Sequence, residues 1–179
     1  MKSHIVVGVT GSVACYKALD LIRDLKKLGM SLEVVLTKEA EEFIRPILFQ
    51  SISGNKVITS GLFNLPEEWE LAHISLAEKA DLIVVAPATA NIIGKIAGGI
   101  CDDMLTCAIC ATKAPVLFVP AMNEGMYKNK IVQGNIQKLK KLGYKFTGPV
   151  KGKLACGSEA IGHIQDTEVI VNEVRRLVK

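Results

Sequence analysis

Short apolar runs alternate along the chain with segments that have the spacing of an amphipathic helix. Apolar runs predict buried strands at 4–9, 32–36, 82–86 and 116–119, and a short strand is predicted at 144–147. Helical spacing predicts helices at about 14–28, 38–43, 47–52, 104–111, 131–142 and 166–178, and another that starts near residue 91. Strands and helices that alternate with short joins are typical of βαβ units. The pattern therefore predicts an α/β fold, with a parallel sheet that has helices on both faces.

Four segments stand out from this pattern. Residues 53–70 predict a loop with at most one short strand, and residues 148–162 predict a glycine-rich loop. Residues 120–127, PAMNEGMY, follow a buried strand and place one amide between two methionines. Residues 72–76, AHISL, are expected to lead into a helix. Because loops hold most binding and catalytic residues, these are the first places to look for function.

The composition limits the class of protein. The chain has 179 residues, 49% of them hydrophobic and 22% charged, with a mean hydropathy of +0.30. These values predict a single domain over residues 1–179 with a large aliphatic core. No apolar stretch approaches the ~20 residues that span a bilayer, and residues 1–14 resemble a first strand more than a signal peptide. The five cysteines are expected to be free thiols, Cys107 and Cys110 among them as small core residues, in a cytoplasmic protein.

The charge is unevenly distributed. Residues 128–153 contain eight lysines and no acidic residue, although the net charge is only +4. No aromatic residues interleave with these lysines in a way that suggests base stacking, which disfavours a nucleic-acid surface. A solvated helix face explains most of them. Lys151 and Lys153 lie in the glycine-rich segment instead, where they could attract an anionic small molecule.

Four loops are expected to meet at the ligand-binding edge of the sheet, since ligands of such folds lie beyond the carboxyl ends of the strands. The first reads GVTGSVA over 8–14 and is neither a GxGxxG nor a Walker A sequence. It could bind a phosphate, or be a tight turn in which Ser12 caps a helix. In the second loop, Thr37 occupies the place of the acid that usually binds a ribose diol. NAD is therefore not the obvious ligand, and FMN fits as well.

Several polar residues could perform chemistry. His73 precedes a buried strand, and a histidine there is either structural or a proton-transfer group. Thr89 and Asn91 begin a helix, where Asn91 could simply cap it. Cys156 lies among lysines and glycines, which suits a reactive thiol better than the helical setting of Cys107 and Cys110. No second Cys/His pair stands at zinc spacing, so no metal site is expected.

Five motifs, in order along the chain, carry a resemblance. They are GSVACYK (11–17), HISL (73–76), APATAN (86–91), PAMNEGMY (120–127) and LACG (154–157). Over nearly its whole length the chain resembles the homo-oligomeric flavin-containing cysteine decarboxylase family. The resemblance implies a Rossmann-like fold that binds FMN, and trimers or trimer-based dodecamers with the flavin at subunit contacts.

The resemblance also implies a role for individual residues. The residues that would hold the cofactor are Gly11, Ser12 and Val13 at its phosphate, with Thr37, Thr89, Asn91 and Ala121. His73 and Cys156 would be catalytic, Cys156 as a proton donor. The substrate would be bound by Asn123, Met126, Lys153, Leu154 and Ala155, with Asn123 holding its carboxylate. Two positions depart from the family: Tyr127 stands where Trp is frequent, and His163 where Arg is frequent.

The implied reaction is FMN-dependent decarboxylation of 4′-phosphopantothenoylcysteine to 4′-phosphopantetheine, on the route to coenzyme A. Oxidation of the thiol-bearing carbon gives a thioaldehyde that accepts the electron pair as CO2 leaves, and re-reduction follows. With no fused ligase domain in residues 1–179, a separate phosphopantothenate–cysteine ligase is the expected partner. The alternatives are a peptide C-terminal cysteine decarboxylase, a flavin prenyltransferase and a non-catalytic regulatory flavoprotein subunit. Because His73, Asn123 and Cys156 are all present, the sequence favours catalysis.

Overall fold

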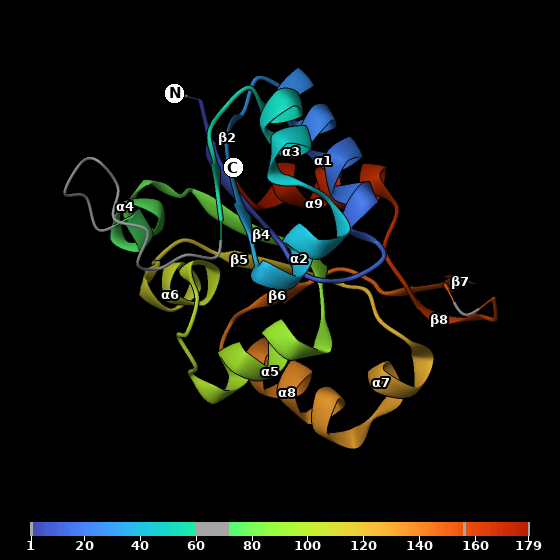
Figure 1. Cartoon of the computed structure of the whole chain (residues 1–179). Coiled ribbons are helices and arrows are strands. Elements are labelled where there is room, and N and C mark those ends of the chain that lie inside the picture. Colours follow the sequence, from blue (N-terminus) through green and yellow to red (C-terminus); the bar gives the residue numbers. More distant parts are fainter. Residues whose placement is uncertain (1, 60–71, 156, 179) are drawn as a thin grey trace.

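A computed structural model describes residues 2–59, 72–155 and 157–178. At its centre is a parallel sheet in the order β3-β2-β1-β4-β5-β6 (Figure 1). Its strands are β1 (His4–Val9), β2 (Ser31–Leu36), β3 (Val57–Ile58), β4 (Leu82–Ala88), β5 (Val116–Pro120) and β6 (Lys145–Phe146). Each neighbouring pair is parallel. The order reverses between β1 and β4, so the loops after these two strands diverge and leave a crevice at the carboxyl edge.

Helices cover both faces of the sheet, which confirms the predicted α/β fold. The face with α1 (Cys15–Lys27) also has α2 (Lys38–Phe43), α3 (Pro46–Ser53) and α9 (Thr167–Leu177). The opposite face has α4 (Ala72–Lys79), α5 (Ala90–Gly98), α6 (Met104–Ala111) and α8 (Lys130–Lys141). The short helix α7 (Glu124–Lys128) follows β5 directly, inside the segment predicted to be a loop. No helix in the described part of the chain is long and apolar enough to cross a bilayer.

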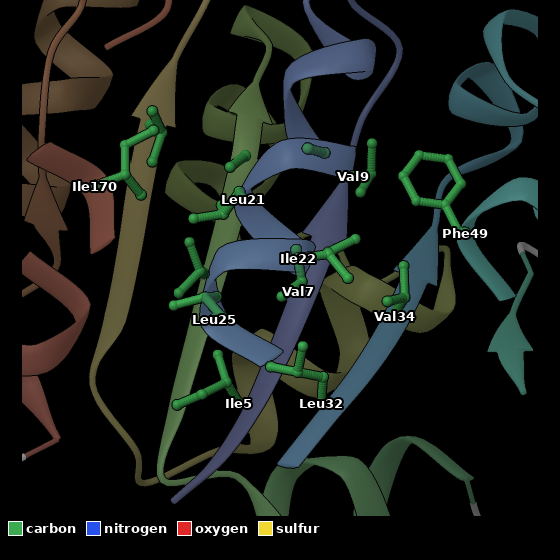
Figure 2. Close-up of a cluster of buried hydrophobic side chains, with 14 of the residues drawn as sticks. Ile5, Val7, Val9, Leu21, Ile22, Leu25, Leu32, Val34, Phe49 and Ile170 are labelled. Atoms are coloured by element: carbon green, nitrogen blue, oxygen red, sulfur yellow. The ribbon is translucent and has the colours of Figure 1, made fainter. Parts of the chain in front are cut away.

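The core explains why the strands have continuous apolar runs rather than alternating ones. Side chains of β1 alternate between two clusters, with Ile5, Val7 and Val9 on one face and Val6 on the other. Figure 2 shows the first cluster, in which the strand residues pack against Leu21, Ile22 and Leu25 of α1. A strand buried on both faces needs apolar residues at every position. The predicted bounds of 4–9 for β1 match the structure.

The prediction of a glycine-rich loop over 148–162 is wrong. This segment contains strands β7 (Val150–Lys153) and β8 (Glu159–His163), which form a separate antiparallel two-stranded sheet. Two of its glycines are needed because a larger residue would not fit. A Cβ on Gly152 would lie 2.9 Å from His163 Cγ, and one on Gly162 would overlap the Met122 carbonyl oxygen. Gly162 also has a φ of 133°, which favours glycine.

Two further segments can be compared with their predictions. Residues 72–76 are already part of helix α4 rather than a lead-in to it. In the irregular region 53–70, the described part holds the short strand β3, as predicted, while residues 60–70 lie outside the described residues. The structure places the hairpin of β7 and β8 at one end of the molecule, away from α4 (Figure 1).

Candidate active site

Thr10, directly after β1, joins two loops at the carboxyl edge. Its side chain is 2% exposed, and its hydroxyl donates a hydrogen bond of 2.7 Å to the Pro87 carbonyl oxygen. The same hydroxyl accepts a 3.1 Å bond from the Thr89 amide. Buried hydrogen bonds of this kind fix geometry, because breaking one leaves a polar group unpaired. The loops after β1 and β4 are therefore held at a constant separation.

The loop after β1 is also tied to the loops after β5 and β2. The Ser12 hydroxyl donates to the Ala121 carbonyl oxygen at 3.4 Å. The Thr37 amide donates to the Val9 carbonyl oxygen at 3.0 Å. Gly11 packs so closely on Glu39 that any Cβ would collide with it. Gly11 is therefore required at least for this contact between loops, and not only for the approach of a ligand.

The start of helix α1 has unpaired donors. Its N-cap residue is Ala14, no side chain accepts a hydrogen bond as a cap, and its first turn has no acidic residue. The Ser12 hydroxyl accepts a bond of 3.3 Å from the Ala14 amide. Among the described residues, no acceptor faces the amides of Gly11 and Val13. A helix start of this kind favours an anion, both through its free N–H groups and through the helix dipole.

A cavity of about 650 Å³ lies where the hairpin meets the start of α1 and the loop after β5. Its walls are formed by Ser12, Val13, Ala14, Tyr16, Ala121, Met122, Asn123, Lys153, Leu154, Ala155, Gly162, His163 and Ile164. None of these residues is acidic, and two of them, Lys153 and His163, can carry a positive charge. The volume is within the range of small-molecule sites. The cavity therefore suits an anionic ligand with an apolar part.

The cavity brings together seven of the predicted site residues: Ser12, Val13, Ala121, Asn123, Lys153, Leu154 and Ala155. The orientation of the Asn123 amide is defined by its neighbour. Its Oδ1 accepts a 2.8 Å bond from the Gly125 amide and caps α7. Because the oxygen is engaged, the Nδ2 group is the part left to bind a ligand, and Nδ2 is a donor. A donor at the cavity wall matches the predicted carboxylate-binding role.

Four predicted cofactor residues lie at the same edge but do not line this cavity. Thr37 is buried and caps α2 through a 3.4 Å bond from the Ala40 amide. Thr89 caps α5 through the Ile92 amide, so Asn91 is an exposed first-turn residue and not the cap. Gly11 packs on Glu39, as described above. Thr37 and Thr89 have structural partners here, and their contact with a cofactor stays a prediction.

Met126 and His73 are not brought to the cavity by the described structure of one chain. Met126 is 49% exposed on α7 and does not line the cavity. His73 is half-buried on α4, which packs on the face of the sheet opposite to α1. Cys156 lies outside the described residues. Its neighbours Leu154 and Gly157 are joined by a 2.9 Å backbone bond that turns the chain between β7 and β8.

Sequence reasoning missed Thr10, Tyr16 and Gly162, and it noted His163 only as a departure from the family. Thr10 could have been found, since it directly follows a buried strand at the ligand edge. The Nδ1 atom of His163 lies 2.8 Å from the Ile164 carbonyl oxygen. A carbonyl oxygen can only accept, so Nδ1 is the donor in this contact and Nε2 is the ring nitrogen left for another partner. Gly162 gives no local signal, because its close neighbour Met122 is forty residues away in sequence.

The prediction that Cys107 and Cys110 are core residues is wrong. Cys110 is exposed and Cys107 half-buried, near the exposed Cys101 in the preceding loop. Partial desolvation, followed by a hydrogen bond to Cys101 and the charge of the neighbouring thiols, raises the pKa of Cys110 to about 12. In the described part of the chain, no group of three His, Cys, Asp or Glu side chains could hold a metal ion.

Within the described residues, the parallel sheet is covered on both faces and has unpaired amides and a cavity without acidic side chains at its carboxyl edge. This combination is typical of proteins that bind a phosphorylated cofactor or substrate. The model of the family Flavoprotein matches residues 1–179. The chain belongs to this family, which confirms the predicted flavoprotein class.

Two curated relatives are informative. The chain is 46% identical over 170 residues to "Coenzyme A biosynthesis bifunctional protein CoaBC" of Borreliella burgdorferi. The aligned residues cover 95% of this chain and 43% of that protein. The chain thus spans less than half the length of the bifunctional relatives that it matches. It is also 40% identical to "Probable phosphopantothenoylcysteine decarboxylase" of Streptococcus mutans, with 97% of this chain and 98% of that protein aligned.

Two solved structures share the fold. One is a PPC decarboxylase mutant, with cysteine replaced by serine, complexed with pantothenoylaminoethenethiol; its TM-score is 0.88 at 30% identity, over 98% of both chains. The other is the FMN binding protein AtHal3, with a TM-score of 0.84 at 30% identity, over 98% of this chain and 96% of that one.

Proposed function

We propose that the chain is an FMN-dependent decarboxylase that converts 4′-phosphopantothenoylcysteine to 4′-phosphopantetheine in coenzyme A biosynthesis. The observation that carries the proposal is the cavity, which combines the free Nδ2 donor of Asn123 with Lys153 and excludes acidic side chains. The similarity to the relatives and to the PPC decarboxylase structure supports the same substrate. The AtHal3 structure supports FMN as the flavin.

The residues at the carboxyl edge fit an FMN phosphate. The amides of Gly11 and Val13 have no acceptor in the described structure, and the helix dipole of α1 adds a partial positive charge. Ser12 and Ala121, joined by a hydrogen bond, would border the cofactor. Thr37, Thr89 and Asn91 at the neighbouring loop ends would complete its contacts. When bound, FMN supplies a reversible two-electron oxidation of the thiol-bearing carbon of the substrate.

Asn123 would hold the substrate carboxylate. With Oδ1 engaged by Gly125, the Nδ2 group donates charge-assisted hydrogen bonds to the carboxylate oxygens and fixes the cysteine end in the cavity. Leu154, Ala155 and Ile164 make part of the surrounding wall apolar. An apolar wall favours the loss of charge that accompanies the change from carboxylate to CO2. The chain thus orients the scissile bond and limits the water around it.

Cys156 and His73 would act on protons. Cys156 follows the cavity residue Ala155, so its thiol is a candidate to protonate the product carbon. His73 is on the far face of its own sheet, and we propose that it reaches a cavity of another copy in a homotrimer or a trimer-based dodecamer. Met126, exposed on α7, would contact the substrate in the same assembly. The site would then be complete only in the oligomer.

The bifunctional relatives suggest a partner. We propose that a phosphopantothenate–cysteine ligase, which makes the substrate, works with this chain, and that both are cytoplasmic. The lysines of 128–153 are spread over α8 and its neighbours, and two of them have partners within the chain: the Lys138 ammonium donates to the Ala97 carbonyl oxygen at 2.6 Å, and Lys128 pairs with Glu124 at 2.7 Å. This arrangement does not support a nucleic-acid or membrane partner.

The test is turnover of 4′-phosphopantothenoylcysteine by the flavin-loaded protein, followed by CO2 release and product mass. The key variant is Asn123→Asp, since aspartate still caps α7 but replaces the donor with a charge that repels the carboxylate. Turnover should fall at least about 100-fold. Asn129→Asp is the matched control, because Asn129 caps α8 in the same way through the Ile131 amide and should be active. Preference for a peptide with a C-terminal cysteine, or a protein with no affinity for FMN, would contradict the proposal.

A further inference from the structure

The imidazole ring of His163 is fixed in the cavity wall by two contacts. His163 is the last residue of β8 and is half-buried. Its ring lies against Gly152 of β7, since a Cβ on that glycine would come within 2.9 Å of the ring Cγ. Its Nδ1 atom donates a 2.8 Å hydrogen bond to the Ile164 carbonyl oxygen. Because Nδ1 is engaged, Nε2 is the ring nitrogen that a ligand in the cavity can bind.

The backbone next to His163 is held as well. The Gly162 carbonyl oxygen accepts a 3.1 Å hydrogen bond from the Met122 amide, which joins β8 to the loop that contains Asn123. His163 and Asn123 therefore form neighbouring parts of the same wall. A side chain whose ring and backbone are both held loses little conformational freedom when it binds a ligand.

The groups around His163 do not include a counter-ion for it. Lys153 of β7 and Tyr16 of α1 share the cavity wall with the histidine, and among the described residues no carboxylate lines that wall. On α7, which packs against β8, Glu124 is paired with Lys128 at 2.7 Å. The other titratable groups on adjoining segments are exposed or half-buried outside the cavity: Lys17, Tyr127, Lys151, Glu159 and Asp166. A positive charge on the ring would therefore have to be balanced by the ligand.

The bond from Nδ1 decides what Nε2 can do. In a neutral imidazole one nitrogen donates and the other accepts, so Nε2 is an acceptor as long as Nδ1 donates to Ile164. The oxygens of a carboxylate or of a fully ionised phosphate only accept, and they gain no hydrogen bond from an acceptor. Nε2 becomes a donor when the ring takes up a second proton, which also makes it positively charged. An oxyanion can thus bind at this nitrogen only together with a proton.

We propose that His163 binds an oxyanion of the substrate, its phosphate or its carboxylate, with uptake of one proton at Nε2. The identity of this ligand rests on the function proposed above. In the complex the imidazolium donates a charge-assisted hydrogen bond to the oxyanion and adds a positive charge to that of Lys153. Because the complex then holds one proton more than the free protein, affinity falls as pH rises, by at most about tenfold per pH unit.

The test uses the FMN-loaded protein and a substrate analogue that cannot be oxidised at a thiol. In 4′-phosphopantothenoylserine a hydroxyl replaces the thiol. Titration calorimetry in buffers of different ionisation enthalpy measures the protons taken up, at a pH above about 7, where a phosphate monoester is already fully ionised. We expect about half a proton to one proton per bound analogue, and a Kd that rises about three- to tenfold from about pH 7.5 to about pH 8.5. Since the chain has only three histidines, NMR of the imidazole nitrogens can show directly that Nε2 of His163 becomes protonated.

Two further analogues identify the oxyanion. Pantothenoylserine lacks the phosphate, and 4′-phosphopantothenoylethanolamine lacks the carboxylate. Proton uptake that disappears with the first analogue assigns the contact to the phosphate. Uptake that disappears with the second assigns it to the carboxylate.

Variants separate the charge of His163 from its hydrogen bond. His163→Gln keeps a donor that cannot titrate, so proton uptake should vanish and affinity should fall about tenfold near neutral pH. His163→Arg is charged at every pH, so it should bind within about threefold of wild type without proton uptake. His4→Gln is the matched control, since His4 lies at the start of β1 beside Ser31 and Glu33, at 3.1 and 3.3 Å, and this variant should keep the uptake.

The inference and the proposed function fail in different ways. Binding of 4′-phosphopantothenoylserine without proton uptake, or uptake that persists in His163→Gln, would overturn the role of His163 and leave the proposed function intact. If the analogue does not bind at all, the proposed function fails. Inorganic phosphate then tests His163 alone, and an NMR spectrum in which phosphate does not protonate Nε2 would overturn the inference.

Discussion

Strands β1 and β4 are buried at almost every residue. Strand β7 instead alternates between half-buried and exposed positions, and in β8 only Ala160 and Gly162 are buried. The sheet is held by two hydrophobic clusters, one on each face. The hairpin of β7 and β8 is joined to the loop after β5 by a 3.1 Å bond from the Met122 amide to the Gly162 carbonyl oxygen. A two-stranded hairpin alone is marginally stable in water.

This difference separates the residues that stabilise the fold from those that shape the cavity. The sheet supplies Ser12, Ala121 and Asn123 through loops fixed at its edge, and the hairpin supplies Lys153 and His163 through a contact with few buried side chains. Changes in the sheet should therefore alter the free energy of unfolding. Changes in the hairpin should alter turnover at nearly constant stability.

The largest effect is expected for Phe118→Ala in β5. Phe118 is fully buried, and its ring centroid lies 5.2 Å from that of Phe146 and 5.8 Å from that of Tyr144. The free energy of unfolding should fall by about 3–5 kcal/mol, measured by denaturant titration, because a large cavity is created. Ile161→Ala in β8, a half-buried hairpin residue, is the comparison and should cost about 1 kcal/mol or less. Similar losses in both variants would remove the distinction between the regions.

Gly162→Ala should affect the hairpin alone. A Cβ at this residue would overlap the Met122 carbonyl oxygen, and the φ of 133° is unfavourable for alanine. We expect the hairpin to shift away from Asn123 and turnover of the proposed substrate to fall about 100-fold, with thermal unfolding nearly unchanged.

Gly143→Ala is the matched control for this variant. Gly143 has a φ of 98°, but there is open space around it at the end of α8. This variant should lose stability and keep its turnover. A Gly162→Ala protein that unfolds early and binds substrate normally would reverse the comparison.

Thr10→Val tests the junction between the loops after β1 and β4. Valine has the same shape but leaves the Pro87 carbonyl oxygen and the Thr89 amide without their partner. The free energy of unfolding should fall by about 2 kcal/mol in chemical denaturation. Ser51→Ala removes a hydroxyl that donates to the Ile47 carbonyl oxygen at 2.8 Å on the exposed side of α3, and it should change stability by about 0.5 kcal/mol or less. Equal losses of unfolding free energy in Thr10→Val and Ser51→Ala would show that burial of the Thr10 hydroxyl does not strengthen its contribution to stability.

The smallest effect is expected for Lys153→Ala. Lys153 lines the cavity, and removal of its charge should raise the KM for the phosphorylated substrate about tenfold with kcat little changed. Lys151→Ala on the same strand is the control, because Lys151 is exposed and does not line the cavity. Steady-state kinetics of the two variants measure how much of the binding comes from the hairpin. A larger increase in KM for Lys151→Ala than for Lys153→Ala would show that the anionic group of the substrate binds outside the cavity.

Periodicity and composition were sufficient to predict the sheet. Strands buried on both faces have uninterrupted apolar runs, so the bounds of β1 could be read directly. Helix α1 ends at Lys27, one residue before the predicted end at 28, and Gly29 follows with a φ of 78°. The hairpin could not be predicted in this way. Gly152 and Gly162 suggest a loop by their local propensity, and the reasons for them, His163 and Met122, are contacts that exist only in the folded chain.

The candidate site was predicted only in part, again because some of its features depend on contacts between segments that are distant in sequence. Motifs identified Ser12, Asn123 and Lys153, since each lies next to a strand end or a recognisable loop. No local pattern shows that Thr10 connects two loops or that Asn123 presents Nδ2 rather than Oδ1. The exposure of Cys110 was missed because a helix of small residues usually indicates the core. These properties depend on which segments meet in space.

The uncapped start of α1 has a consequence for how long the protein persists in the cell. With the proposed phosphate bound there, the folded state is stabilised by about 2.7 kcal/mol when the free cofactor is at a hundred times its Kd. Chains made in excess of the flavin supply lack this contribution, so they unfold more often and are exposed to proteases. The supply of the flavin would thus determine the abundance of the protein as well as its activity.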